Sequence, residues 1–219
     1  MSEKSAKQAR RTARCPSVAD LDRFLTSLGQ PSTGIGQAGR IDRIAVLEKL
    51  KAAAAAAQAR ETVAFKQSRL AEEQAAGIPV RKHGKGLAGE VALARRESPN
   101  RGSRLVGVAD ALVQEMPHTM AALTKGELSE WRATLLVRET ACLSVEDRRE
   151  VDARMADRIT GLSDAALVAE ARRHAYALDP VGFLNRGKNA EADRHVSARP
   201  APDLMSRLSA LLPCAQGWR

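Results

Sequence analysis

Residues 41–76 read IDRIAVLEKLKAAAAAAQARETVAFKQSRLAEEQAA, and this stretch decides the class of fold. The alanine run at 52–57 has the highest helix propensity available and allows close approach of a second helix. Apolar residues recur at helical spacing along the stretch, at Ile41, Ile44, Leu47, Leu50, Ala54, Ala57 and Phe65. We therefore predict one helix over residues 41–76, about 50 Å long at a rise of 1.5 Å per residue. A helix of this length could project from a small domain or pair with another chain.

Shorter helices are predicted on both sides of the long one. A polar, basic tail precedes a helix over residues 17–28, and a linker rich in glycine and proline runs from Gly29 to Gly39. After the long helix comes a basic loop over residues 77–86 and then a short helix at about 87–96. Serines stand where N-caps belong before four of the later helices, at Ser98, Ser129, Ser144 and Ser163.

The last part of the chain carries a weaker pattern. Residues 194–199 alternate like a short strand, and Asp203 is predicted to cap a final helix with Leu204, Leu208 and Leu211 on one face. The predicted fold is therefore mainly α: a multi-helix domain with a long N-terminal helix, a helix-turn-helix-like pair and at most one short hairpin or strand near the C-terminus. Residues 1–40 form the mobile basic tail, short helix and linker, and residues 41–217 form the helical domain.

The composition limits the kind of protein. Hydrophobic residues make up 44% of the chain and aromatic residues only 3%, which favours a packed helical core over disorder or a β-rich fold. The net charge of +9 favours nucleic acid or another anionic surface as a partner.

The three cysteines, Cys15, Cys142 and Cys214, form no CxxC pair, so neither a zinc site nor a disulfide framework is indicated. No secretory signal or bilayer-spanning run is evident, and we expect a reducing bacterial cytoplasm.

Two patterns resemble catalytic or cofactor motifs, and neither has the context that the chemistry needs. Residues 34–39 (GIGQAG) match the dinucleotide fingerprint GxGxxG, but a linker precedes them instead of a strand. His174, Asn189 and His195 follow the order of an HNH nuclease site, which needs a histidine base and metal ligands on a ββα unit. His174 lies at helical spacing where no such unit is predicted. We therefore predict no catalytic residue, no metal ligand and no cofactor for this chain, and no small-molecule substrate is evident.

The most suggestive feature is a basic window over residues 81–104. Seven arginines and lysines stand there against Glu90 and Glu97. In a helix-turn-helix, the start of the second helix meets phosphates or base edges in the major groove. The candidate DNA-binding residues are Arg81, Lys82, Lys85, Arg95, Arg96, Asn100, Arg101 and Arg104. The alternative is an ordinary helical hairpin with solvated arginines, because the turn lacks the usual glycine.

Several blocks of the chain resemble the 13E12 repeat family, also called domain of unknown function 222. They are residues 87–104 (LAGEVALARRESPNRGSR), 111–123 (ALVQEMPHTMAAL), 128–143 (LSEWRATLLVRETACL) and 194–216. The similarity runs from about Ile41 to Gly217. Relatives typically place this helical domain before a C-terminal HNH endonuclease domain, so the resemblance implies a DNA-linked role. It supplies no functional residues, because the role of the helical domain is not established.

The resemblance also predicts that this chain stops short. The segment LSALLPCAQG at 208–217 continues into another helix in the family, whereas here Trp218 and Arg219 end the chain abruptly. A frameshift, a degenerate copy or an alternative gene boundary would each produce such an end, and a divalent metal would belong to the missing HNH domain. The resemblance, together with the basic window, implies a DNA-binding or DNA-positioning module of an HNH-endonuclease-like protein, truncated before its nuclease domain. The alternative is a structural or oligomerisation module, self-associating through the 41–76 helix.

Overall fold

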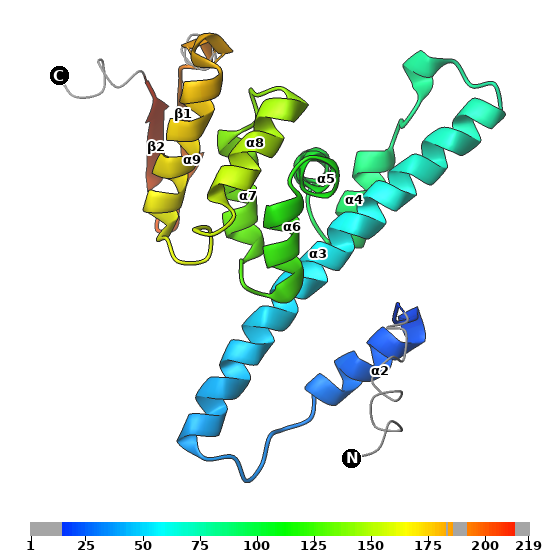
Figure 1. The fold of residues 1–219 in the computed structure, drawn as a ribbon, viewed down its shortest axis with the longest axis vertical. Helices are drawn as coiled ribbons and strands as arrows, with labels where there is room; N and C mark the ends of the chain where they lie inside the picture. The colour runs from blue at the N-terminus through cyan, green and yellow to red at the C-terminus, as the bar shows by residue number, and fades with distance from the viewer. Residues whose placement is uncertain (1–14, 183, 186–191, 213–219) are drawn as a thin grey trace, which may run out of the picture. The chain divides into compact units, whose positions relative to one another are not determined.

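The computed structural model of the chain describes residues 15–182, 184–185 and 192–212 (Figure 1). The chain divides into two compact units, residues 1–44 and residues 45–219, and each is described by itself. The long helix α3 (Gln37–Ala75) passes from the first unit into the second. It begins four residues before the predicted start, so the linker after the first helix is shorter than Gly29–Gly39.

In the N-terminal unit, helix α2 (Val18–Leu28) begins at a capping box. The Asp20 N–H donates to the Ser17 hydroxyl at 3.2 Å, and the Ser17 N–H donates to the Asp20 carboxylate at 3.0 Å. The Ser17 hydroxyl also donates to the Asp20 carboxylate at 2.6 Å, and this bond, with those from the Ser17 N–H and Arg23, lowers the pKa of Asp20. No α2 residue is buried, and its apolar residues Leu21, Phe24 and Leu25 are all exposed.

The second unit is a succession of helices joined by short turns. They are α4 (Leu87–Ala94), α5 (Pro99–Gln114), α6 (Pro117–Lys125), α7 (Glu130–Glu139), α8 (Val145–Met155) and α9 (Asp164–Leu178). A 3₁₀ turn, η2 (Val80–Lys82), lies in the loop that the sequence predicted between the long helix and α4. The hydroxyls of Ser98, Ser129, Ser144 and Ser163 each accept a hydrogen bond from the backbone N–H three residues on. The four predicted N-caps are therefore confirmed.

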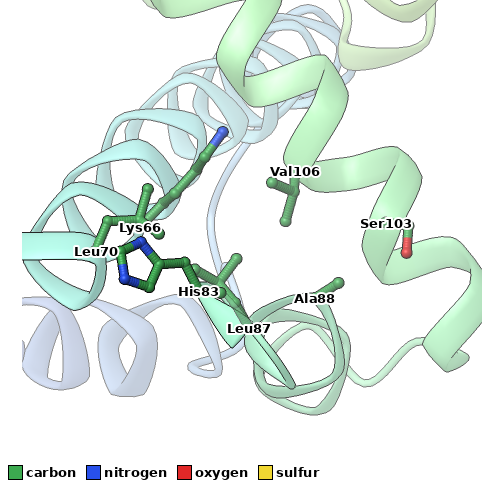
Figure 2. A pocket seen from close by; sticks show the side chains of 8 residues that line it. Lys66, Leu70, His83, Leu87, Ala88, Ser103 and Val106 are labelled. Atoms are coloured by element: carbon green, nitrogen blue, oxygen red, sulfur yellow. The ribbon is translucent and has the colours of Figure 1, made fainter. Parts of the chain in front are cut away.

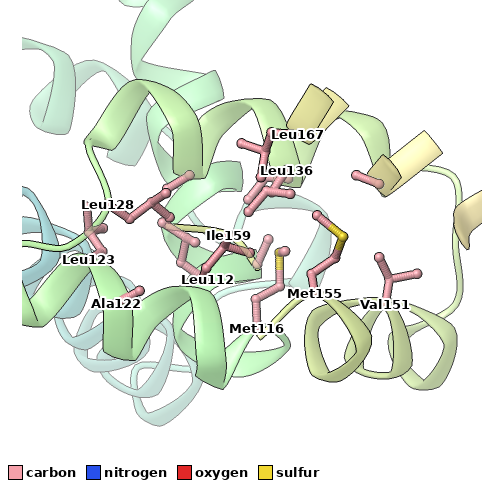
Figure 3. Packing of buried hydrophobic residues seen from close by; sticks show 14 of the residues in the cluster. Leu112, Met116, Ala122, Leu123, Leu128, Leu136, Val151, Met155, Ile159 and Leu167 are labelled. Atoms are coloured by element: carbon pink, nitrogen blue, oxygen red, sulfur yellow. The ribbon is translucent and has the colours of Figure 1, made fainter. Parts of the chain in front are cut away.

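The hydrophobic core of this unit is built from one side of each of α5 to α9 (Figure 3). Its largest fully buried side chains include Leu112, Met116, Leu123, Leu136, Met155 and Leu167. Ala52 and Ala56 of α3 complete the cluster. Their short side chains allow α3 to pack closely against the other helices. A smaller cluster joins Ala59 and Val63 of α3 to Ala109 of α5.

One buried carboxylate lies within this packing. Asp152 of α8 is 1% exposed and caps the start of α6 from the side. It accepts hydrogen bonds from the backbone N–H groups of His118 at 2.7 Å and Thr119 at 3.0 Å, and from the Thr119 hydroxyl. Helix α6 follows Met116 and begins at Pro117 with no capping side chain of its own, so Asp152 satisfies donors that the local sequence leaves open.

The end of the described chain is a hairpin, and here the sequence prediction was partly wrong. Strands β1 (His195–Pro200) and β2 (Ser206–Leu211) pair antiparallel, with His195 opposite Leu211 and Pro200 opposite Ser206. The strand predicted at 194–199 is confirmed, but the helix predicted after Asp203 is a strand. Asp203 and Leu204 have φ values of 61° and 59°, which turn the chain back towards β1 in place of starting a right-handed helix.

Among the helices of the described residues, none combines the length and the hydrophobicity that spanning a bilayer requires.

Candidate nucleic-acid interface

The helix-turn-helix-like pair predicted from the sequence is formed by α4 and α5, which cross with their backbones in close contact. A Cβ atom placed on Gly102 would lie 2.1 Å from the Ala88 carbonyl oxygen and 2.8 Å from the Ala92 Cβ. The crossing therefore requires glycine at position 102. Because Leu87, Val91 and Ala92 of α4 are buried, the short first helix is held firmly enough to orient the second.

The turn between the two helices has an arginine where glycine is usual. The N–H of Glu97 donates to the Ala92 carbonyl at 2.8 Å, and the N–H of Arg96 donates to the Leu93 carbonyl at 3.0 Å. This hydrogen bonding ends α4 in a Schellman-like manner, with Arg96 in the left-handed region at φ 55°. A side chain other than glycine is strained there by roughly 1–2 kcal/mol. The missing glycine thus does not prevent the turn, and it leaves a cation at its apex.

Replacing Arg96 by glycine should therefore raise the free energy of unfolding by about 1 kcal/mol, because glycine adopts this backbone conformation without strain. Arg96→Ala is the matched control: it removes the same charge but keeps the Cβ and the strain. Urea unfolding of the two variants beside the unaltered protein measures the difference. Equal stabilities of the glycine and alanine variants would show that the turn is not strained.

The structure divides the predicted DNA-binding residues into exposed and engaged groups. Asn100 is exposed, and five cations are exposed without an ion pair to any described residue: Arg81, Lys82, Lys85, Arg96 and Arg104. The Arg101 side chain is 63% exposed and pairs at 3.1 Å with Glu97, which lies just before the N-cap of α5. Arg95 is 20% exposed, and its guanidinium lies 2.8 Å from Glu130 of α7. Arg95 therefore links two helices, unlike the rest of the window.

A pocket of about 320 Å³ joins the basic loop to the start of α5 (Figure 2). His83 and Gly84 of the loop line it together with Ser103 and Val106 of α5. Leu87 and Ala88 of α4 and Lys66 and Leu70 of α3 complete the lining. Loop residues and α5 residues that are about twenty positions apart thus border one hollow.

Polar contacts from α3 hold the loop and both helices that border this pocket. The Gly84 N–H donates to Glu73 at 2.7 Å, and Lys66 Nζ lies 2.6 Å from Asp110 of α5. Arg69 forms two hydrogen bonds to Glu90 of α4, which raise the pKa of Arg69. Nothing in the sequence marks Lys66 or Arg69, since their importance depends on partners in other helices.

The histidines that follow the order of an HNH site have other surroundings. His174 of α9 lies 3.8 Å from Glu170, and partial burial together with Arg173 lowers its pKa despite that carboxylate. His195 is exposed in β1, and its Nδ1 lies 2.8 Å from the Asp193 carbonyl. Asn189 lies outside the described residues. Within the residues that the structure describes, no three histidine, cysteine, aspartate or glutamate side chains cluster to hold a metal ion.

The GxGxxG stretch at residues 34–39 consists of the end of a loop and the first turn of α3. Residues 34–36 are irregular, and α3 begins at Gln37, so Gly39 lies in the first turn of that helix. Between Cys15 and Gly36 the chain is helix α2 and irregular backbone, with no strand ahead of the glycines. The strand–turn–helix context of a dinucleotide site is therefore missing.

Comparison with known proteins assigns the chain to a family. No curated protein and no solved structure matches it. A model of the family described as "Domain of unknown function (DUF222)" matches residues 44–217, which cover α4 to α9, the hairpin and most of α3. Since this match spans well over half of the chain, the protein belongs to the DUF222 family.

Proposed function

We propose that this protein binds the phosphate backbone of DNA through the basic surface of residues 81–104. The observation that supports this most is a set of exposed cations in the window that make no ion pair with any described residue: Arg81, Lys82, Lys85, Arg96 and Arg104. A carboxylate that pairs with an arginine or lysine weakens the attraction of that cation for a phosphate. These five cations have no such partner among the described residues. A strained arginine at the apex of the turn is a further sign, since strain of this kind persists mainly at functional positions.

The α4–α5 pair supplies the rigidity that such a surface needs. The close crossing at Gly102 fixes the start of α5. Because α5 begins after its N-cap Ser98, the residues Asn100, Arg101 and Arg104 lie in the first two turns of that helix. This is the part of a helix-turn-helix that approaches DNA. In the protein context that the resemblance implies, the module positions DNA for an HNH endonuclease domain.

A salt titration of duplex binding tests the proposal. Phosphate contacts make log K fall with log salt by about 0.9 per contact. We expect Arg104→Ala to reduce this slope by about one contact, because Arg104 is exposed and no described carboxylate pairs with it. Arg154→Ala is the matched control, an exposed α8 arginine paired with Glu150 at 2.8 Å, and it should leave the slope unchanged. No duplex binding at low salt would refute the proposed function.

Self-association through α3 is a second candidate, supported by a different observation. Ile41 and Ile44 are 66% and 62% exposed near the start of α3. Residues three apart lie on one side of a helix, and exposed apolar side chains placed in this way are typical of a face that another helix covers. We propose a second copy of this chain as that partner. Light scattering should then show a dimer that Ile41→Lys with Ile44→Lys converts to a monomer; a monomeric unaltered protein at high concentration would exclude it.

A further inference from the structure

The pocket beside the basic loop has an apolar interior with a few polar groups at its edge. Leu70, Leu87, Ala88 and Val106 supply the apolar walls, and His83 and Ser103 stand on opposite sides of the hollow (Figure 2). Its volume of about 320 Å³ lies at the small end of the range for small-molecule sites. The pocket therefore has room for one flat ring system of modest size.

The polar groups offer hydrogen bonds of both kinds. Nε2 of His83 lies 2.8 Å from the Ile78 carbonyl oxygen, which can only accept, so Nε2 carries the proton. In the neutral ring Nδ1 is then an acceptor. The Ser103 hydroxyl is exposed and can donate or accept. The Lys66 ammonium is already engaged by Asp110, so it does not place an uncompensated charge in the hollow.

Cations directly neighbour lining residues in the sequence, both in the loop and in α5. Lys82 and Lys85 adjoin the lining residues His83 and Gly84, and Arg104 follows the lining residue Ser103. All three are exposed and make no ion pair within the described ranges. A ligand that matches this arrangement has a flat, largely apolar centre with hydrogen-bonding edges and carries negative charge on either side.

We propose that the pocket receives one unpaired nucleobase of a DNA strand, whose flanking phosphates meet Lys85 and Arg104. This inference rests on the proposed function and makes it more specific: the module would prefer DNA with an extruded or unpaired base over a perfect duplex. Burying the base against Leu70, Leu87 and Val106 removes apolar surface from water, which contributes affinity for any base. The duplex itself cannot use the pocket, since its bases are stacked and paired.

Three duplexes of one sequence test the inference: fully paired, with one bulged thymidine, and with an abasic site at the bulge. We expect the bulged thymidine to lower Kd roughly tenfold relative to the paired duplex, and the abasic bulge to lose this gain. Ser103→Leu should abolish the preference by filling the pocket, so that bulged and paired duplexes bind alike. Ser68→Leu, the same change at an exposed α3 position outside the pocket, should keep the preference.

The outcomes separate the two proposals. Equal binding of paired and bulged duplexes, with the expected salt slope, overturns the base pocket and leaves the phosphate surface standing. Equal binding of the thymidine and abasic bulges by the unaltered protein also overturns the pocket, whatever Ser103→Leu does to folding. Failure to bind any of the three duplexes refutes the proposed function itself. Competition by free thymidine monophosphate at the concentration of the bulged DNA would assign the pocket to a free nucleotide and overturn the inference.

Discussion

Gly102→Ala should lower the free energy of unfolding by about 3 kcal/mol, since the crossing of α4 and α5 leaves no room for a side chain. The added Cβ would lie 2.1 Å from the Ala88 carbonyl oxygen, which is a backbone atom and can move only with its helix. The helices must separate, and the buried side chains of α4 lose part of their packing. Urea unfolding followed by circular dichroism measures the change.

Gly107→Ala is the control in the same helix. No atom lies within 4 Å of the position that its Cβ would occupy, and the residue is exposed. The substitution should raise the free energy of unfolding by about 0.5–1 kcal/mol, because alanine favours helix more than glycine does. If Gly102→Ala lowers the free energy of unfolding and Gly107→Ala, five residues on, raises it, the close crossing is established. A loss below about 1 kcal/mol for Gly102→Ala would contradict it.

Asp152→Ala should lower the free energy of unfolding by about 3 kcal/mol or more, because it leaves two buried donors and one partly buried donor without their acceptor. These are the backbone N–H groups of His118 and Thr119 and the Thr119 hydroxyl, all held by one carboxylate that is 1% exposed. The start of α6 would lose the only side-chain cap described for it. Thermal and urea unfolding are the measurements.

Two further variants separate the cap from the carboxylate charge. Asp152→Asn keeps one acceptor oxygen and should recover part of the loss, and Thr119→Val should lose about 1 kcal/mol by removing the hydroxyl alone. If Asp152→Asn and Asp152→Ala unfold alike, the hydrogen bonds are not what the aspartate contributes. Asp147→Ala on the same helix is the matched control, since that carboxylate accepts from the Ser144 hydroxyl at 2.9 Å in an exposed position.

The helices were largely predictable from the sequence, because the signals that start and stop them are local. A serine at N-cap reaches only to the backbone three residues on, and Ser98, Ser129, Ser144 and Ser163 could be recognised without knowing the fold. The alanine-rich long helix was likewise evident from propensity alone. The resemblance to the DUF222 family was also recognisable from sequence blocks, and the match over residues 44–217 confirms it.

The C-terminal hairpin shows where local periodicity fails. Leu204, Leu208 and Leu211 fit the spacing of a helix, yet residues 206–211 pair with β1. A strand gains its backbone hydrogen bonds from another segment, and the spacing of apolar residues within one segment does not reveal whether that partner exists.

The sequence by itself determined a basic, mainly helical protein with its capped helices and its positively charged window. Only the tertiary structure decided which of those charges are available. Arg95 pairs with Glu130, 35 residues away, whereas Arg104 in the same window stays free of an ion pair among the described residues. It also decided that position 102 has no room for a side chain and that His83 and Ser103 border one pocket. Helix starts depend on neighbours within one turn, while free charges, close crossings and pockets depend on residues that only packing brings together.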